Sequence, residues 1–192
     1  MRDGSGTRRK IHEAALRLFV EKGVAETTVR DLAQAAGIAE GTLYRHYASK
    51  DDLVADLFAT HYAAFAHRLE AVQRDHAAFD GKLVAIIAEF CRFFDSEPML
   101  FRFLMLVQHQ TLHRVADDAG NPVEVVHRIL AEAMDRGEIA RFPKGLATTM
   151  VLGLLLQPAY GLVYGRLAQP FALYADTITA ACRAVLGSAD HA

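Results

Sequence analysis

Apolar residues recur with the spacing of an amphipathic helix in three short segments near the N-terminus, 11–19, 29–36 and 43–47. Gly23 follows the first segment and Gly37 follows the second, and a glycine commonly ends a helix at such a position. Only a few residues separate the second segment from the third. The pattern therefore predicts a short helix, a tight glycine-containing turn and another short helix, which is a helix-turn-helix.

Polar residues at the predicted helix starts support these boundaries. Thr27 or Thr28 can cap the second helix, and Ser49 predicts the capped start of a fourth helix over about 50–72. The third helix lacks such a cap, because the Ala39 side chain has no oxygen to accept a hydrogen bond from the first backbone N–H groups. We therefore expect a less firmly fixed start for this helix.

The rest of the chain predicts five further helices, at about 79–95, 98–116, 122–136, 144–167 and 170–186. Pro158 lies inside the fourth of these, where we expect it to kink or interrupt the helix. No alternating stretch bounded by turns predicts a strand. The expected fold is all-α with about nine helices, in which residues 1–52 form an N-terminal three-helix domain and residues 53–192 form a C-terminal helical domain.

We expect a cytoplasmic protein, and its net charge of −2 gives no hint of a polyanionic partner, whereas the distribution of charge along the chain does. The uncharged segment 145–165 is long enough to span a bilayer, but its Thr, Gln, Pro and Tyr residues favour a buried helix, so we expect no membrane span. Cys91 and Cys182, far apart in apolar surroundings, fit free thiols in a reducing compartment. Residues 1–50 contain nine Lys and Arg against six Asp and Glu, whereas the remainder contains 12 against 17. A basic N-terminal part favours a polyanionic partner.

The third helix presents a side suited to the major groove of DNA. Because successive helical residues turn by about 100°, Leu43 and Tyr47 face inward, whereas Gly41 and Arg45 lie opposite with Thr42 beside them. The glycine permits a close approach of the backbone, and the guanidinium can reach a guanine edge with two hydrogen bonds.

Further candidates surround this side. Tyr44 and His46 lie at its two edges, and Lys50 is placed for a phosphate just beyond the helix. Arg30 and the hydroxyl of Thr28, at the start of the preceding helix, can add contacts to bases or phosphates. For each residue taken alone, a solvated or packing role is the alternative.

The stretch "TTVRDLAQAAGIAEGTLYRHYASKDDLVADLF" resembles the DNA-binding domain of the TetR (tetracycline-repressor-like) family of transcriptional regulators, and the match covers roughly residues 8–58. Ala39 departs from the family pattern, in which many relatives have a capping Ser. The basic run 8–10 is interpreted either as an arm that reaches DNA or as a charged tail. The resemblance implies DNA contacts from seven residues: Thr28, Arg30, Thr42, Tyr44, Arg45, His46 and Lys50.

The resemblance also implies a C-terminal domain that forms a homodimer and binds a small molecule. The helices predicted at 144–167 and 170–186 suit the dimer interface, because both are apolar and the first is rich in small residues. An apolar cavity with a few polar groups is typical of a small-molecule site, although ordinary core packing is the alternative for each residue. The candidate ligand-binding residues are Phe65, Phe90, Phe94, Phe101, Leu104, Met105, Gln108, Gln157, Tyr160 and Tyr164.

We therefore expect a homodimeric repressor that a small molecule releases from a palindromic DNA operator. An activator, or a regulator controlled by a protein partner, is the alternative. No phosphate-binding loop, nucleophile elbow or metal motif is found, so we expect neither an enzyme nor a cofactor. His109 and His113 are spaced i, i+4 without an evident third ligand, so we also expect no metal site.

Overall fold

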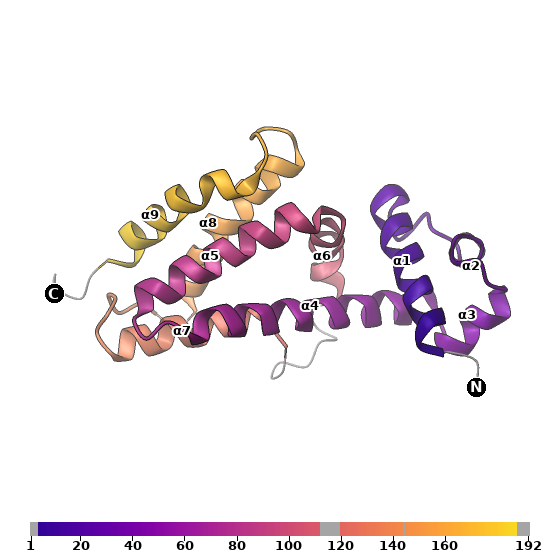
Figure 1. Cartoon of the computed structure of the whole chain (residues 1–192), viewed down its shortest axis with the longest axis horizontal. Helices are drawn as coiled ribbons and strands as arrows, with labels where there is room; N and C mark the ends of the chain where they lie inside the picture. Colours follow the sequence, from indigo (N-terminus) through magenta and orange to yellow (C-terminus); the bar gives the residue numbers. More distant parts are fainter. Residues whose placement is uncertain (1–3, 112–119, 144, 188–192) are drawn as a thin grey trace. The chain divides into compact units, whose positions relative to one another are not determined.

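Helices joined by turns and short connections make up residues 4–111, 120–143 and 145–187, which are the residues that the computed structural model describes (Figure 1). No strand occurs in these ranges, so the predicted all-α fold is confirmed. The elements are α1 (Gly4–Lys22), α2 (Val29–Ala36), α3 (Glu40–His46), α4 (Lys50–Arg74), α5 (Phe79–Ser96), α6 (Pro98–Thr111), α7 (Pro122–Asp135), α8 (Leu146–Val163), the 3-10 turn η2 (Phe171–Tyr174) and α9 (Ala175–Leu186).

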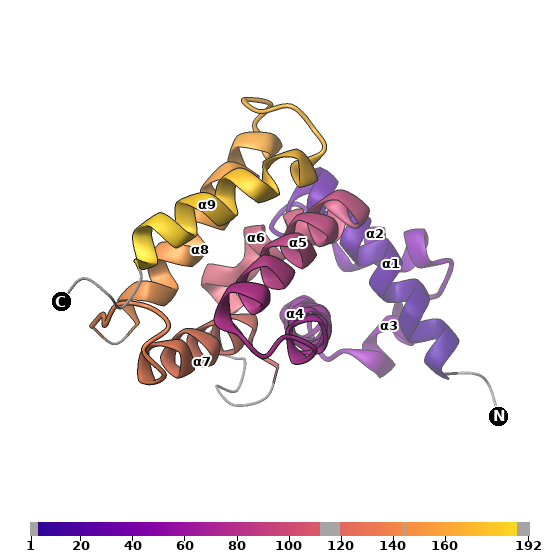
Figure 2. The ribbon, with the colours of Figure 1, turned by 60° about the vertical axis from the view of Figure 1, so that its left-hand side comes forward.

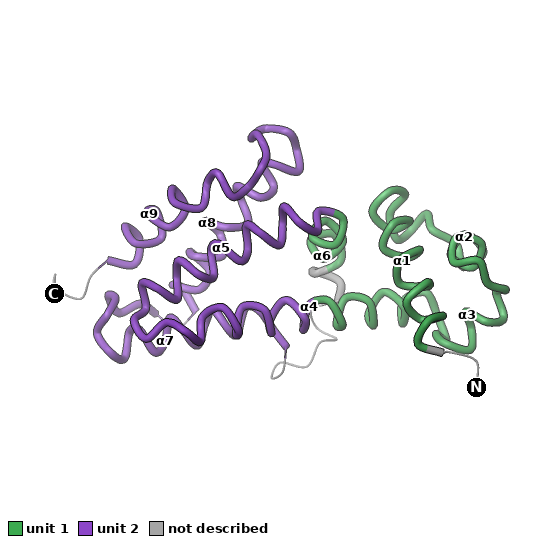
Figure 3. Tube along the Cα trace, viewed as in Figure 1, with its two compact units in different colours: residues 1–61, 99–116 green, residues 62–98, 117–192 purple. Residues whose placement is uncertain are grey.

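The chain divides into two compact units, and unit 1 comprises residues 1–61 and 99–116 (Figure 3). Phe103 of α6 stacks on Phe19 of α1 with 6.0 Å between ring centroids. The first part of α4 buries Leu57 in the same unit. Because of these contacts, unit 1 includes more of the chain than the predicted domain 1–52.

The helix-turn-helix within unit 1 has the predicted boundaries. The Thr28 hydroxyl accepts the N–H of Asp31 at 3.1 Å, and the Asp31 carboxylate accepts the N–H of Thr28 at 3.0 Å, so α2 begins with a capping box. Gly37 has a φ of 65°, and this left-handed conformation ends α2 by directing the N–H of Ile38 to the carbonyl of Ala33. The turn to α3 thus depends on a glycine at position 37.

Unit 2 comprises residues 62–98 and 117–192, and α5 is its central helix. In this unit α5 packs against α7, α8, η2 and α9, and α8 lies alongside α9 (Figure 2). Asp95 of α5 accepts the N–H groups of Phe171 and Ala172 at 2.7 and 3.0 Å, which fixes the start of η2. The segment predicted as one helix over 170–186 is therefore a 3-10 turn followed by α9.

Helix α8 is shorter than the predicted 144–167, and it continues through Pro158 without interruption. It ends where Gly165 takes a φ of 68° and the N–H of Arg166 donates to the Gly161 carbonyl at 2.8 Å. Among the described helices, α8 alone has the length and apolar composition to cross a membrane, and a third of its residues are buried within the chain. Burial within the chain therefore accounts for only some of the apolar residues of α8.

The two cysteines are buried free thiols, as predicted. Burial raises the pKa of Cys91 to about 12 and that of Cys182 to about 11. Both thiols therefore stay protonated near neutral pH, and neither is a reactive nucleophile.

Candidate nucleic-acid interface

The two sides of α3 differ as its sequence predicts. Leu43 is fully buried and Tyr47 nearly so, whereas Arg45 and Tyr44 are exposed, with 53% of Tyr44 accessible. A Cβ atom added at Gly41 would meet no other atom within 4 Å, so the helix backbone is open to the outside at this position. The exposed side of α3 can thus approach a flat or grooved surface closely.

The Arg45 side chain is oriented by its own helix. One guanidinium nitrogen, Nη2, donates to the Thr42 hydroxyl at 3.0 Å on the exposed side. This bond holds the guanidinium along the helix rather than letting it extend freely. His46 is also exposed, and Thr42 is half-buried. The residues predicted on α3 therefore form one continuous exposed surface.

The N-terminal end of α3 lacks a side-chain cap, as predicted. Ala39 has an extended backbone, and only its carbonyl contributes, accepting the N–H of Thr42 at 2.8 Å. Glu40 places a negative charge in the first turn, which favours the positive end of the helix dipole. The firm attachment of α3 must therefore lie at its other end.

A network of polar side chains supplies that attachment. The Tyr47 hydroxyl at the end of α3 donates to Asp56 Oδ2 at 2.7 Å, and His12 Nε2 lies 2.7 Å from the Tyr47 oxygen and 3.0 Å from Asp56 Oδ2. Arg8 binds Asp56 through Nη2 at 2.5 Å and Tyr47 through Nε at 3.2 Å. The network joins α1, α3 and α4. Arg8 is thus part of α1, and it belongs neither to a flexible arm nor to a charged tail.

Burial and charge shift the pKa values of this network. Burial raises the pKa of Tyr47 to about 12, with a further contribution from Asp56. Burial opposes ionisation of Asp56, but hydrogen bonds from Arg8 and Tyr47 outweigh it and hold the pKa of this carboxyl below its usual value. Burial also lowers the pKa of His12, although Asp56 opposes that change. At neutral pH the folded protein therefore holds an ionised Asp56 beside a neutral imidazole.

This arrangement predicts a stability that falls in mildly acidic solution. Because the pKa of folded His12 lies below the ordinary value of 6.5, the unfolded chain binds more protons below pH 6.5, and the free energy of unfolding decreases as pH falls. Asp56 contributes only at lower pH, since its stabilising effect is lost when the carboxyl itself protonates. We expect the melting temperature to fall less between about pH 7.5 and about pH 5.5 in His12→Gln than in the unchanged protein. An equal fall in both would contradict this role of His12.

The Lys50 ammonium, for which a phosphate contact is predicted, forms hydrogen bonds within the protein. Its ammonium donates to three carbonyl oxygens of the loop between α1 and α2: those of Val24 at 2.6 Å, Ala25 at 3.2 Å and Thr27 at 2.9 Å. An ammonium group has three donors, and these bonds use all of them. Lys50 therefore positions the loop that leads into α2, and a phosphate could be bound only by breaking some of these bonds.

Replacement of Lys50 by Met separates the two roles. Loss of the three bonds is expected to reduce the free energy of unfolding by about 1–2 kcal/mol and to lower the melting temperature by about 5 °C. The dependence of DNA affinity on salt concentration should stay the same, whereas loss of a phosphate contact would reduce its logarithmic slope by about one. Lys22→Met is the control, because it removes the same charge and only an exposed pair with Asp31 at 4.0 Å.

The other predicted DNA contacts, Thr28 and Arg30, lie on exposed positions at the start of α2. The Thr28 hydroxyl accepts a bond in the capping box, so it has a structural role and can still donate its proton to a phosphate. Sequence reasoning missed the polar role of Tyr47 and its partners, because residues 8, 12, 47 and 56 share no local pattern.

The predicted ligand-binding residues are divided between the two units. Phe101, Leu104 and Met105 belong to α6 in unit 1, whereas Phe65, Phe90, Phe94, Gln157, Tyr160 and Tyr164 belong to unit 2. Gln108 and the two histidines at 109 and 113 lie outside the described side chains. Within the described part of the chain, no group of three or more His, Cys, Asp or Glu side chains could hold a metal ion.

In unit 2 the predicted aromatic residues form a packed cluster. Phe65 stacks on Phe93 with 4.5 Å between ring centroids. The Phe171 ring packs edge-on against Phe94 and Phe90, with centroid distances of 5.1 and 6.2 Å. All five rings are buried. These distances are those of a close-packed core, so a ligand could enter this cluster only by separating rings that touch.

Two of the predicted ligand-binding residues on α8 lie at the surface of the chain. Gln157 and Tyr164 are exposed, with 66% of Tyr164 accessible, and Tyr160 is half-buried. The opposite side of α8 faces the core of unit 2 through Val151, Leu155, Ala159 and Leu162. Because α8 is apolar all round, its neighbours rather than its sequence decide which side is buried.

Comparison with known proteins gives a consistent result. Residues 11–57 match the family pattern described as "Bacterial regulatory proteins, tetR family". Over 53 residues the chain is 47% identical to the transcriptional repressor KstR2 of Rhodococcus jostii. This matched segment covers 28% of this chain and 26% of that protein. Over 151 residues it is 24% identical to the fatty acid metabolism regulator protein of Bacillus subtilis, covering 76% and 78% of the two chains. Another regulator, from Mycobacterium tuberculosis, is matched over only 54% of its length.

Solved structures extend the fold similarity to nearly the whole chain. The fatty acid degradation regulator FadR from Bacillus halodurans superposes with a TM-score of 0.78 and 16% identity, covering 98% of this chain and 100% of the other. FadR from Bacillus subtilis, solved in complex with stearoyl-CoA, superposes with a TM-score of 0.76 and 19% identity, covering 91% of this chain and 96% of the other. These named relatives are regulators rather than enzymes. Residues 11–57 of this chain thus match the TetR family of bacterial regulatory proteins, and its all-α fold is shared with these solved regulators over nearly the whole length.

Proposed function

We propose that the protein is a homodimeric transcriptional repressor, acting in the cytoplasm, that binds a pseudo-palindromic DNA operator and is released by a small molecule. The exposed side of α3 carries this proposal. A bare backbone position at Gly41, the Thr42 hydroxyl and an oriented Arg45 guanidinium share one surface. A dimer would place two such helices in successive major grooves, about 34–36 Å apart.

The contacts have different roles in this proposal. Arg45 reads a guanine edge, and Tyr44 and His46 bind at the two edges of the groove. Thr28 and Arg30 of α2 add phosphate or base contacts, which position the protein on the duplex. Lys50 acts indirectly by holding the loop before α2. Only Arg45 is expected to carry most of the discrimination between base pairs.

The proposed dimer uses the outward sides of α8 and α9. Leu173 and Val185 are exposed, with 67% and 39% of their surface accessible, and Leu146 and Leu167 are also exposed. Exposed leucines in adjacent elements favour burial against a second copy. Sedimentation at micromolar concentration should give a dimer mass, and a monomer at all concentrations would contradict the proposal.

The proposed effector is a long-chain acyl thioester, because a structural relative over most of the chain is described as a complex with stearoyl-CoA. In this chain such a molecule would have to separate the packed rings of Phe65, Phe93 and Phe171. Stearoyl-CoA added to the protein–operator complex should release the DNA, whereas free coenzyme A should not. Retention of the complex at saturating stearoyl-CoA would exclude this class of effector.

Binding to DNA itself is tested with a labelled fragment from upstream of the protein's own gene. Fluorescence anisotropy should show binding that weakens steeply as salt rises and that exceeds binding to a scrambled fragment by at least about 1,000-fold. A reporter driven by the same fragment should rise when the gene is deleted, and a fall would indicate an activator instead. Absence of salt-sensitive, selective binding would overturn the proposed function.

A further inference from the structure

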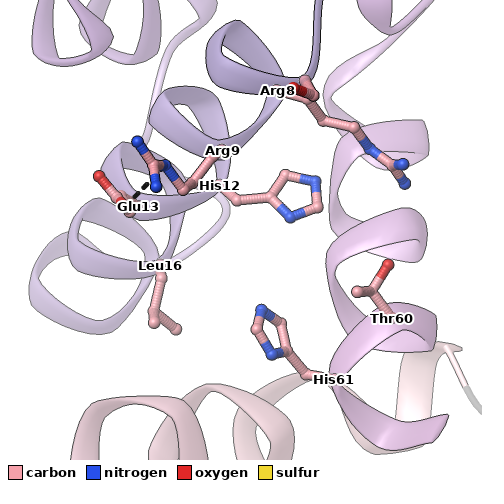
Figure 4. A pocket seen from close by; sticks show the side chains of 8 residues that line it. Arg8, Arg9, His12, Glu13, Leu16, Thr60 and His61 are labelled. Carbon is pink, nitrogen blue, oxygen red and sulfur yellow. Dashed lines mark ion pairs between the residues drawn. The ribbon is translucent and has the colours of Figure 1, made fainter. Parts of the chain in front are cut away.

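A cavity of about 470 Å³ lies between α1 and α4 within unit 1 (Figure 4). Its walls include Arg8, Arg9, His12 and Leu16 from α1, and Thr60 and His61 from α4. This volume falls within the range of about 300–1,000 Å³ that small-molecule sites occupy. The cavity belongs to the same unit as the recognition helix and is separate from the aromatic cluster of unit 2.

Two imidazoles face each other across this cavity. The ring centroids of His12 and His61 are 6.4 Å apart, and Figure 4 shows both rings directed into the space between the helices. His12 uses Nε2 for the network with Tyr47 and Asp56, and its second ring nitrogen lies on the side of His61 in the figure. A protonated imidazole has an N–H on each nitrogen, so it can donate to a bound anion without giving up the network.

The remaining lining includes carbon surface and two arginines that are paired with carboxylates. Arg8 and Arg9 line the cavity with only one acidic residue, Glu13, which lies 3.8 Å from Arg9 in an exposed pair. Asp56, which pairs with Arg8, is not among the lining residues. Most of the lining surface is carbon, including the Leu16 side chain. Donor groups beside a carbon wall match a molecule with a negative charge and an apolar part.

We propose that this cavity, here called the α1–α4 site, binds a small organic anion whose charge meets the two imidazoles and whose apolar part packs on Leu16. An aromatic carboxylate has this chemistry and fits the available volume. The site is independent of the proposed effector site in unit 2. It gives the DNA-binding unit a ligand of its own.

Two lining residues, His12 and Arg8, link the α1–α4 site to the end of the recognition helix, and Arg8 donates to the Tyr47 hydroxyl at 3.2 Å. His12 lines the cavity and lies 2.7 Å from the hydroxyl of Tyr47, the residue that ends α3. An anion that stabilises the imidazolium form of His12 therefore changes the charge at the attachment of α3. Any resulting change in operator affinity must be matched by an equal effect of the operator on anion affinity.

The test uses benzoate as the probe and the full chain without DNA. Titration followed by nuclear magnetic resonance should give saturable shifts of the His12 and His61 ring signals. Benzamide, which has the same shape without the charge, should bind at least about tenfold more weakly. Inorganic phosphate, which lacks the apolar part, should also bind more weakly.

A matched pair of variants locates the site. Thr60 is exposed on α4, so Glu or Gln can replace it without disturbing the core. Thr60→Glu brings a negative charge to the cavity and should weaken benzoate binding by at least about tenfold, whereas the isosteric Thr60→Gln should retain it. Equal melting temperatures of the two variants would show that both are folded.

Three results would overturn the proposal: no saturable shift of either histidine, equal affinity for benzoate and benzamide, or equal benzoate affinity in the two Thr60 variants. Because this titration contains no DNA, its failure leaves the proposed regulatory function untouched. Operator binding measured without benzoate tests that function separately.

Discussion

Replacing Arg45 by Ala is expected to weaken operator binding about 100-fold while leaving binding to unrelated DNA nearly unchanged. A bidentate contact to guanine contributes about 1–3 kcal/mol of discrimination, and a dimer makes the contact twice. The protein should remain folded, because the contact of Arg45 with Thr42 lies at the surface. Anisotropy measured in parallel with operator and scrambled duplexes gives the two affinities.

The control for this variant is Arg141→Ala. Arg141 is also exposed, but it belongs to unit 2, so its loss changes the net charge equally without touching α3. Arg45→Lys tests the geometry, since an ammonium keeps the charge but cannot form the paired hydrogen bonds of a guanidinium. If the two alanine variants lost operator affinity equally, Arg45 would act only through its charge and the assigned reading surface would be wrong.

The largest expected effect on stability comes from Arg68→Met in unit 2. Arg68 of α4 donates to Glu89 at 2.6 Å and to Glu97 at 2.6 Å, and its guanidinium lies 5.1 Å from the ring centroid of Phe93. Glu89 is only 1% exposed. Its second oxygen forms an ion pair with Arg92, but without the geometry of a hydrogen bond. The substitution therefore leaves a buried carboxylate with one imperfect partner.

Breaking a buried pair in this way typically costs about 3–5 kcal/mol, which corresponds to a fall of about 10 °C in melting temperature for a chain of this length. The double variant Arg68→Met with Glu89→Leu should recover much of the loss, because it removes the uncompensated charge. Glu97→Gln, at a half-exposed position, should change stability by less than about 1 kcal/mol. A melting temperature within about 2 °C of the unchanged protein in Arg68→Met would show that Arg92 alone compensates Glu89.

The helix-turn-helix could be predicted closely because its signals are local. Thr28 and Gly37 mark the two ends of α2 through bonds to residues three to five positions away, and the spacing of Leu43 and Tyr47 fixes the inward side of α3. Such interactions are nearly independent of the rest of the fold. The sequence therefore predicts both the helix boundaries and the exposed surface of α3.

The hydrogen bonds of Lys50 could not be predicted from the sequence. Its position just past α3 favours a phosphate contact, but its ammonium meets carbonyls more than twenty residues earlier in the chain. The partners of Tyr47 are similarly distant, at His12 and Asp56. Contacts of this kind depend on how α1 and α4 pack, and no periodicity in the sequence encodes that packing.

The sequence predicts the C-terminal helices, but it does not predict which side of each helix is buried. An amphipathic helix reveals its buried side, whereas α8 has apolar residues on every side and offers no such signal. Only the positions of α5, α7 and α9 decide that Leu155 is covered and Tyr164 is not. For this physical reason the sequence could not predict the exposure of Gln157 and Tyr164 on α8.

Ala39 leaves room for natural variation in the strength of DNA binding. A serine at this position would add the missing cap, which is typically worth about 1 kcal/mol to a helix. The change from an alanine codon to a serine codon requires one nucleotide substitution. A regulator with an uncapped recognition helix can therefore evolve a longer residence time on its operator in a single step, without altering any residue that reads the bases.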